Sequence, residues 1–181
     1  MRTRSKYSII GGVYEGPKVF IGQLDLRFDP VVSLGILEDV RGSLRVDGVG
    51  TLKDLGNLRS VGGDLDLMGT SIKSLGRLGA VGGYLDIGKT DVKSLGNLRS
   101  LYRDLYLSSD SKIFSLGKLA NVSPDTSMYI GDHKENYQEL SKKVSTFLKE
   151  TPLEDYPIHM NHENLIIRNM VMEHLESGVA S

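Results

Sequence analysis

Short segments in which apolar and polar residues alternate recur every 20 residues along the centre of the chain. The stretch VGGDLDLMGTSIKSLGRLGA, which begins at Val61, is followed directly by VGGYLDIGKTDVKSLGNL. Leu65 returns as Leu85, and Thr70 returns as Thr90. Self-similarity at a short fixed period is typical of stacked coils, each of which buries its apolar edge against the next. We therefore expect a solenoid.

Each coil opens with an apolar–polar–apolar triplet, which has the period of a β-strand. The apolar pairs are Leu24 and Leu26, Leu44 and Val46, Leu65 and Leu67, Leu85 and Ile87, and Leu105 and Leu107, and a truncated sixth coil is expected at Met128 and Ile130. Repeated glycines argue against a helix on the return path, which is therefore predicted to be extended or a 3₁₀ turn.

These patterns predict one structural domain in three parts. Residues 1–22 hold two apolar runs separated by GGVYEGP and are interpreted as an N-terminal β cap, residues 23–133 as the solenoid, and residues 134–181 as a C-terminal helical cap. The predicted fold class is mainly β or α+β, with a single layer of parallel strands in five to six coils. The last helix is apolar between Leu165 and Leu175, so it either covers the final coil or binds a partner or a second copy of the chain.

The segments LDLMGTSIKSL and LDIGKTDVKSL resemble the LxLxxNxLxxL consensus of leucine-rich repeats. Thr70 and Thr90 stand where that consensus has asparagine, and Asp29 and Asp110 stand there in other coils. These side chains are expected to bond to turn backbone. The preceding VGG is similar to receptor L domains, whose coils are flatter and closer to a β-helix. The resemblance covers about residues 23–123 and implies an architecture rather than an activity.

The composition describes a globular chain of 181 residues with net charge −1 and no cysteine. The absence of cysteine excludes disulfides and thiol catalysis and favours a reducing compartment. The N-terminal apolar run, Ile9 and Ile10, is too short for a secretory signal, so a cytoplasmic location without membrane association is expected. A net charge near zero argues against general nucleic-acid binding. A small cysteine-free repeat protein would suit a bacterium or a phage.

The polar positions of the repeated triplets should point outward and form one surface, here called the strand face. Its members are Gln23, Asp25, Arg27, Ser43, Arg45, Asp47, Asp64, Asp66, Tyr84, Asp86, Asp104, Tyr106, Ser127 and Tyr129. This acidic surface with tyrosines is predicted to bind a basic segment of a protein partner, rather than to be merely solvated. The predicted centre of contact is Asp64, Asp66, Tyr84, Asp86, Asp104 and Tyr106.

Two alternative functions use the same face. The aspartates could mimic nucleic-acid charge and block a basic groove on a host or defence enzyme. The solenoid could also bind or cleave carbohydrate, although the chain has no tryptophan to serve as a sugar platform.

A second charged feature recurs in the turns and is called the basic edge. It comprises Lys53, Lys73, Lys93, Arg59 and Arg99. It could contact nucleic acid or an acidic protein, but it has no interleaved aromatic residues, so a solvated ladder is the favoured interpretation.

Enzymatic motifs are weak, and the sequence predicts a protein that is not an enzyme and has no catalytic residue, metal or cofactor. His159, His162 and Glu163 form HxxHE, which differs from the HExxH of zinc proteases. No helix is predicted after the glycine-rich stretches, although a phosphate-binding loop opens a helix, and no GxSxG motif is present.

Overall fold

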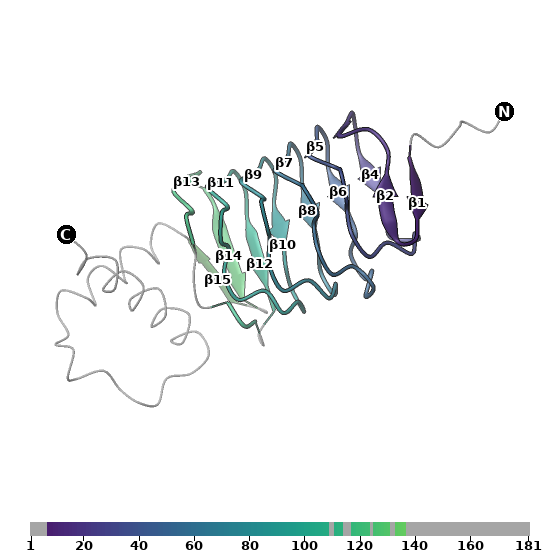
Figure 1. Ribbon diagram of the computed structural model, residues 1–181. Coiled ribbons are helices and arrows are strands. Elements are labelled where there is room, and N and C mark those ends of the chain that lie inside the picture. Colours follow the sequence, from purple (N-terminus) through teal and green to yellow (C-terminus); the bar gives the residue numbers. More distant parts are fainter. Residues whose placement is uncertain (1–6, 109–110, 114–116, 124, 131–132, 137–181) are drawn as a thin grey trace, which may run out of the picture.

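The chain forms a parallel-strand solenoid of about five turns, seen in a computed structural model (Figure 1). The structure describes residues 7–108, 111–113, 117–123, 125–130 and 133–136. Coils of about 20 residues stack along one axis, from a hairpin at the N-terminal end to an antiparallel strand at the other. The predicted repeat architecture is confirmed at this level.

The first sheet is built from the repeated triplets. In spatial order its parallel strands are β4 (Leu24–Asp25), β6 (Leu44–Arg45), β8 (Leu65–Asp66), β10 (Leu85–Asp86), β12 (Leu105–Leu107) and β14 (Ser127–Ile130). The register follows the repeat, because Leu65 pairs with Leu44 on one side and with Leu85 on the other. The strand β15 (His133–Asn136) pairs antiparallel with β14 at the C-terminal edge of this sheet.

A second parallel sheet forms on the return path, where the sequence predicted only extended chain or turns. Its strands are β3 (Val19–Phe20), β5 (Asp39–Val40), β7 (Ser60–Val61), β9 (Ala80–Val81), β11 (Ser100–Leu101) and β13 (Asn121–Val122). Val61, Val81 and Leu101 pair in register and are buried. The expected single layer is thus incomplete. The extended return path is confirmed, since no helix occurs among the described residues.

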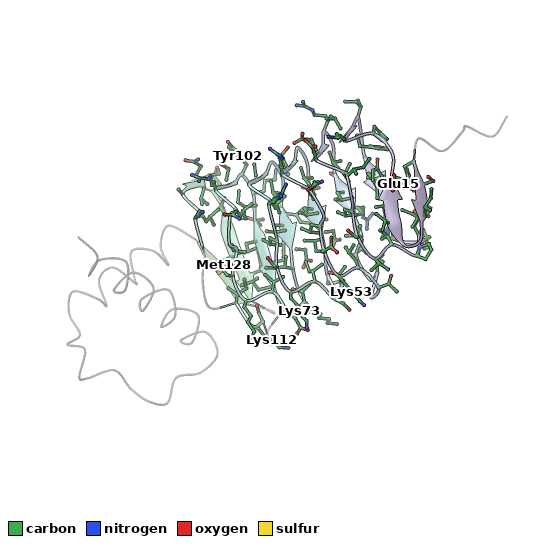
Figure 2. The ribbon with its side chains drawn as sticks, in the orientation of Figure 1. Glu15, Lys53, Lys73, Tyr102, Lys112 and Met128 are labelled. Carbon is green, nitrogen blue, oxygen red and sulfur yellow. The ribbon has the colours of Figure 1, made fainter. Side chains whose placement is uncertain are left out.

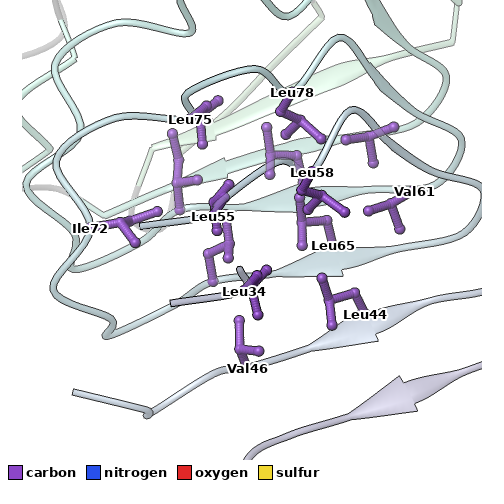
Figure 3. Close-up of a cluster of buried hydrophobic side chains, with 14 of the residues drawn as sticks. Leu34, Leu44, Val46, Leu55, Leu58, Val61, Leu65, Ile72, Leu75 and Leu78 are labelled. Carbon is purple, nitrogen blue, oxygen red and sulfur yellow. The ribbon is translucent and has the colours of Figure 1, made fainter. Parts of the chain in front are cut away.

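The core is one continuous stack of leucine, valine and isoleucine between the two sheets (Figure 3). A single coil contributes Leu65, Ile72, Leu75, Leu78 and Val81, none of which is more than 1% exposed. Each such side chain, fully buried, stabilises the fold by roughly 1.5–3 kcal/mol. The neighbouring coils supply the covering atoms, so the stability of each coil depends on the next.

The corner after the second sheet brings the backbones of successive coils into close contact. A Cβ added to Gly82 would lie 2.2 Å from the carbonyl oxygen of Gly62, and one added to Gly62 would lie 2.5 Å from that of Arg41. Any larger residue would therefore push two coils apart. This steric limit explains why VGG recurs in the repeat.

The N-terminal end carries the antiparallel hairpin β1 (Ser8–Ile10) and β2 (Val13–Glu15). The hydroxyl of Tyr7 donates a hydrogen bond to Asp29 at 2.9 Å, and its ring stacks on Tyr14 with centroids 5.7 Å apart. These contacts tie the residue before the hairpin to the first coil.

At the other end, residues 134–136 belong to β15, within the segment predicted as a helical cap. The rest of the predicted helical cap, including the apolar stretch from Leu165 to Leu175, lies in residues 137–181, outside the described residues. Along the described parts of the chain, we find no helical segment with the length and apolar character of a membrane span.

Candidate functional site: the strand face

The strand face contains two straight rows of side chains that run along the solenoid axis. The central row is Asp25, Arg45, Asp66, Asp86, Tyr106 and Tyr129, each paired in register with the next. Beside it runs the flanking row, which includes Ser43, Asp64, Tyr84, Asp104 and Ser127. Neighbours in either row are one strand spacing apart, about 4.8 Å. The six residues predicted as the centre of contact therefore belong to two adjacent rows.

Charges at the N-terminal end of the face are paired. Arg27 contacts Asp25 at 2.7 Å and Asp47 at 3.9 Å, and Arg45 approaches Asp47 at 3.6 Å. The hydrogen bond from Arg27 holds the pKa of Asp25 below its usual value. Both arginines of the face are thus engaged with its first two aspartates.

The other aspartates of the face form no salt bridge with any residue that the structure describes. These aspartates are Asp64, Asp66, Asp86 and Asp104. Partial burial raises the pKa of Asp66 to about 6, and the negative charges of Asp47 and Asp86 add to this effect. Burial also raises the pKa of Asp86. The centre of the face is therefore a place where added positive charge would be stabilising.

The same aspartates also hold the backbone, a role that the sequence interpretation missed. Asp66 accepts a hydrogen bond from the backbone N–H of Met68 at 3.2 Å, and Asp86 accepts one from Gly88 at 2.8 Å. Aspartate side chains in turns typically accept a hydrogen bond from the backbone two residues further along. The position of each Asp directly before a turn could therefore have predicted this role from the sequence.

In the flanking row the aspartates join successive coils. Asp64 accepts from the N–H of Tyr84 at 3.1 Å, and Asp104 accepts from that of Ser127 at 2.9 Å. These bonds fix the carboxylates in place, and each carboxylate still has room for a further donor, since it offers about four lone-pair positions.

The tyrosines form an aromatic ladder at the C-terminal end of the face. Tyr84 meets Tyr106 edge to face, with centroids 5.6 Å apart, and Tyr106 stacks on Tyr129 at 4.6 Å with the planes 11° apart. Burial and, secondarily, the nearby carboxylates raise the pKa of Tyr84 and Tyr106. The ladder continues the rows of aspartates with rigid apolar surface.

A hollow of about 260 Å³ opens beside the acidic centre. It is lined by Gln23, Ser43, Arg45, Asp64 and Tyr84. Within the described structure, the buried Nε of Arg45 and Oδ1 of Asp47 have no hydrogen-bond partner. The two atoms lie 3.6 Å apart, so they form an ion pair but are too far apart for a hydrogen bond. Gln23, Ser43 and Arg45 thus border the site, although the sequence did not place them at its centre.

The basic edge consists of two separate rows. Lys53, Lys73 and Lys93 are exposed, and Figure 2 shows Lys53 and Lys73 along one border of the solenoid, with Lys112 beyond them. Arg59 and Arg99 stand at a different corner, directly before β7 and β11. Gly79 lies between the two arginines in the stack. Its N–H donates to the backbone carbonyl of Arg59, and its own carbonyl accepts from the backbone N–H of Arg99. The two rows cannot act as one continuous surface.

A metal site finds no support in the described part of the molecule. In residues 7–136, apart from the few positions that are not described, no group of three or more histidines or carboxylates is placed to hold a metal ion. His159, His162 and Glu163 lie outside the described residues.

Comparison of the chain with protein-family models, characterised proteins and solved structures found no match. The architecture therefore rests on the chain's own repeat and structure, and the resemblance to leucine-rich repeats stays a prediction.

Proposed function

We propose that this chain is a non-enzymatic interaction module, of leucine-rich-repeat type, whose strand face binds a basic segment of a protein partner. The observation that carries the proposal is the acidic centre next to the tyrosine ladder, Asp64, Asp66, Asp86 and Asp104, which no salt bridge reaches among the described residues. Lysine or arginine side chains of a partner would supply the missing counter-charge.

Electrostatics favours this class of partner. Asp66 and Asp86 lie side by side, and their partial burial weakens solvation of the ionised forms. A cation placed over both carboxylates would relieve the repulsion and replace the lost solvation. An arginine could also lie against Tyr84 or Tyr106, because guanidinium groups are attracted to aromatic rings.

Rigidity favours tight binding by few contacts. The carboxylates are held by backbone N–H groups, and the tyrosines hold one another. Little side-chain entropy would therefore be lost on association, which is the general advantage of a preorganised surface.

The test neutralises the acidic centre while keeping its backbone bonds. In the variant Asp66→Asn/Asp86→Asn, the amide oxygens can still accept from Met68 and Gly88, so only the charge changes. The matched control is Asp39→Asn/Asp54→Asn. This control removes the same amount of charge from a part of the surface outside the strand face. There Asp39 accepts from the hydroxyl of Ser60, and Asp54 accepts from the backbone N–H of Gly56.

Wild type, variant and control are immobilised as full chains and used to capture proteins from native lysate, with quantification of each captured protein. The proposal expects a protein retained by wild type and by the control and lost with the variant. Retention by all three to the same extent would show that the strand face is not the binding surface.

The cluster of carboxylates at the centre of the two rows also favours the nucleic-acid mimic as a second candidate. In that case the captured protein would be a nucleic-acid enzyme, it would be displaced by competing DNA, and its affinity would fall steeply with salt. A partner whose binding is indifferent to competing DNA would exclude this alternative.

A further inference from the structure

Two adjoining hollows lie on the border of the solenoid where Figure 2 shows Lys73 and Lys112. The larger, of about 450 Å³, is lined by Gly69, Thr70, Ser71, Lys89, Thr90, Asp91 and Lys112. The smaller, of about 380 Å³, is lined by Lys73, Asp91, Lys93 and Lys112. Because Asp91 and Lys112 belong to both, the two hollows form one continuous depression across three coils.

The depression is strongly positive. Its four lysines surround a single carboxylate, Asp91, which forms an ion pair with Lys112. The bond from Lys112 and, more weakly, the charges of Lys73 and Lys93 lower the pKa of Asp91. Among the described residues, no ion pair reaches Lys73, Lys89 or Lys93. An excess of positive charge therefore faces the space inside.

Lys89 is held there in an unfavourable backbone conformation. Its φ is 53°, and no other non-glycine residue in the described structure has a positive φ. The same repeat position is Gly48, with φ 73°, and Gly69, with φ 70°, in the two preceding coils. A left-handed conformation is unfavourable for a residue with a Cβ, which comes too close to the following carbonyl oxygen. Strain of this kind tends to be kept where a side chain serves a function.

The hydroxyl groups of the depression are already used. Thr70 and Thr90 donate to the carbonyls of Leu67 and Ile87, both at 2.7 Å, and Ser71 donates to Gly50 at 2.6 Å. This bears out the expectation that Thr70 and Thr90 bond to turn backbone. Recognition in the depression must therefore come from the ammonium groups, which select for negative charge.

We propose that this lysine depression binds a small, free anion with several negative charges, of the diphosphate class. Ammonium groups bind phosphate oxygens as compact point charges. The volume is within the range of about 300–1,000 Å³ that is usual for small-ligand sites. A compact anion over Lys73, Lys89 and Lys93, beside the ion pair of Lys112 with Asp91, would balance the excess charge.

The test is a titration of the full chain with inorganic pyrophosphate at low ionic strength, followed by calorimetry and by amide NMR shifts. The variant is Lys89→Gly, which restores the residue of the preceding coils and should fold at least as well as the wild type. The control is Lys53→Gln, which removes an exposed lysine of the same row that lines neither hollow.

The proposal expects saturable binding of one pyrophosphate per chain, with shifts at the residues that line the depression. Lys89→Gly should weaken it about tenfold, the effect of losing one charge-assisted contact. The same substitution should raise the melting temperature by about 2 °C, because it relieves the strain at this position. Lys53→Gln should leave the affinity unchanged.

Non-saturable binding would overturn the proposal. So would equal weakening by Lys89→Gly and Lys53→Gln, since that would indicate general attraction to a basic border. An affinity unchanged by Lys89→Gly would also overturn it.

Discussion

Asp66 lies directly beside Asp86, at the same register position of the neighbouring parallel strands β8 and β10. Like charges in directly opposed positions of a sheet are destabilising. The repeat could have relieved this contact by alternating charge, as it does where Arg45 pairs with Asp25 and with Asp66. The fold instead carries an unfavourable pair at the centre of its outward face, which is a reason to assign that pair a role in binding.

The first prediction is that acidification stabilises the fold through this pair. The pKa of Asp66 is raised to about 6 in the folded chain, above its ordinary value of 3.8, so the folded state holds the proton more tightly than the unfolded state. The free energy of unfolding contributed by Asp66 should therefore fall as pH rises from about 4 to about 6. Asp86 acts in the same direction.

Asp66→Asn is the measurement's control, because it removes the titrating group and keeps an acceptor for Met68. Urea unfolding should show the variant to be more stable than wild type above about pH 6, with the difference vanishing near pH 4. A difference that stays constant with pH would contradict the expectation.

The second prediction concerns Tyr106, which contacts both other tyrosines of the ladder. Tyr106→Ala removes an edge-to-face pair and a stacked pair, each worth about 0.5–1.5 kcal/mol beyond buried area. The free energy of unfolding should fall by about 2 kcal/mol, and Tyr106→Phe should retain most of it. Tyr102→Ala serves as the comparison, since Tyr102 is 57% exposed and makes no ring contact in the described structure. An equal loss for the two alanine variants would contradict the role of the ladder.

The third prediction places Tyr7 at the junction of the N-terminal hairpin and the first coil. Tyr7→Phe keeps the ring against Tyr14 and Phe20 but removes the hydrogen bond to Asp29, so it should cost about 1 kcal/mol. Burial and the bond to Asp29 raise the pKa of Tyr7 to about 12. Its stabilising contribution is therefore complete below about pH 10 and is lost as pH rises towards 12. In denaturant unfolding, the difference between Tyr7→Phe and wild type should shrink over that interval; an undiminished difference would exclude this mechanism.

The sequence predicted the first sheet in register, because the Leu65–Leu85 spacing leaves only one pairing that keeps leucines inside. It did not predict the second sheet, since strands such as Ser60–Val61 are two residues long and show no alternation. Without knowledge of the second sheet, the positions of the corners within a coil could not be predicted. Lys53 and Arg59 therefore seemed to share an edge, although Arg59 stands at the corner where β7 begins.

The site was predictable in its rows but not in its environment. Alternation placed Asp66 and Tyr84 outward, and the structure brings them into adjacent rows. The pairing of Arg45 with Asp47, the bond from Met68 to Asp66 and the strained turn at Lys89 depend on the path of the turns. The triplet pattern does not encode that path.

The last prediction tests the close contact between coils. Gly82→Ala would place a methyl carbon 2.2 Å from the carbonyl oxygen of Gly62 and 2.9 Å from its carbon. Both are backbone atoms that cannot rotate away, and the N–H of Gly62 is itself bonded to the carbonyl of Val40 in the preceding coil. The coils must separate locally, which breaks bonds such as that from the N–H of Gly82 to Val61. We expect a loss of about 3 kcal/mol or more, at the upper end of overpacking substitutions.

Gly50→Ala is the matched control, because the added carbon would have no atom within 4 Å and the φ of Gly50 is not positive. That variant should lie within about 0.5 kcal/mol of wild type. Thermal unfolding of the two variants separates a steric effect from a general sensitivity to alanine. Similar melting temperatures would show that the coils can move apart at little cost, and the repeated glycine pair would then need another explanation.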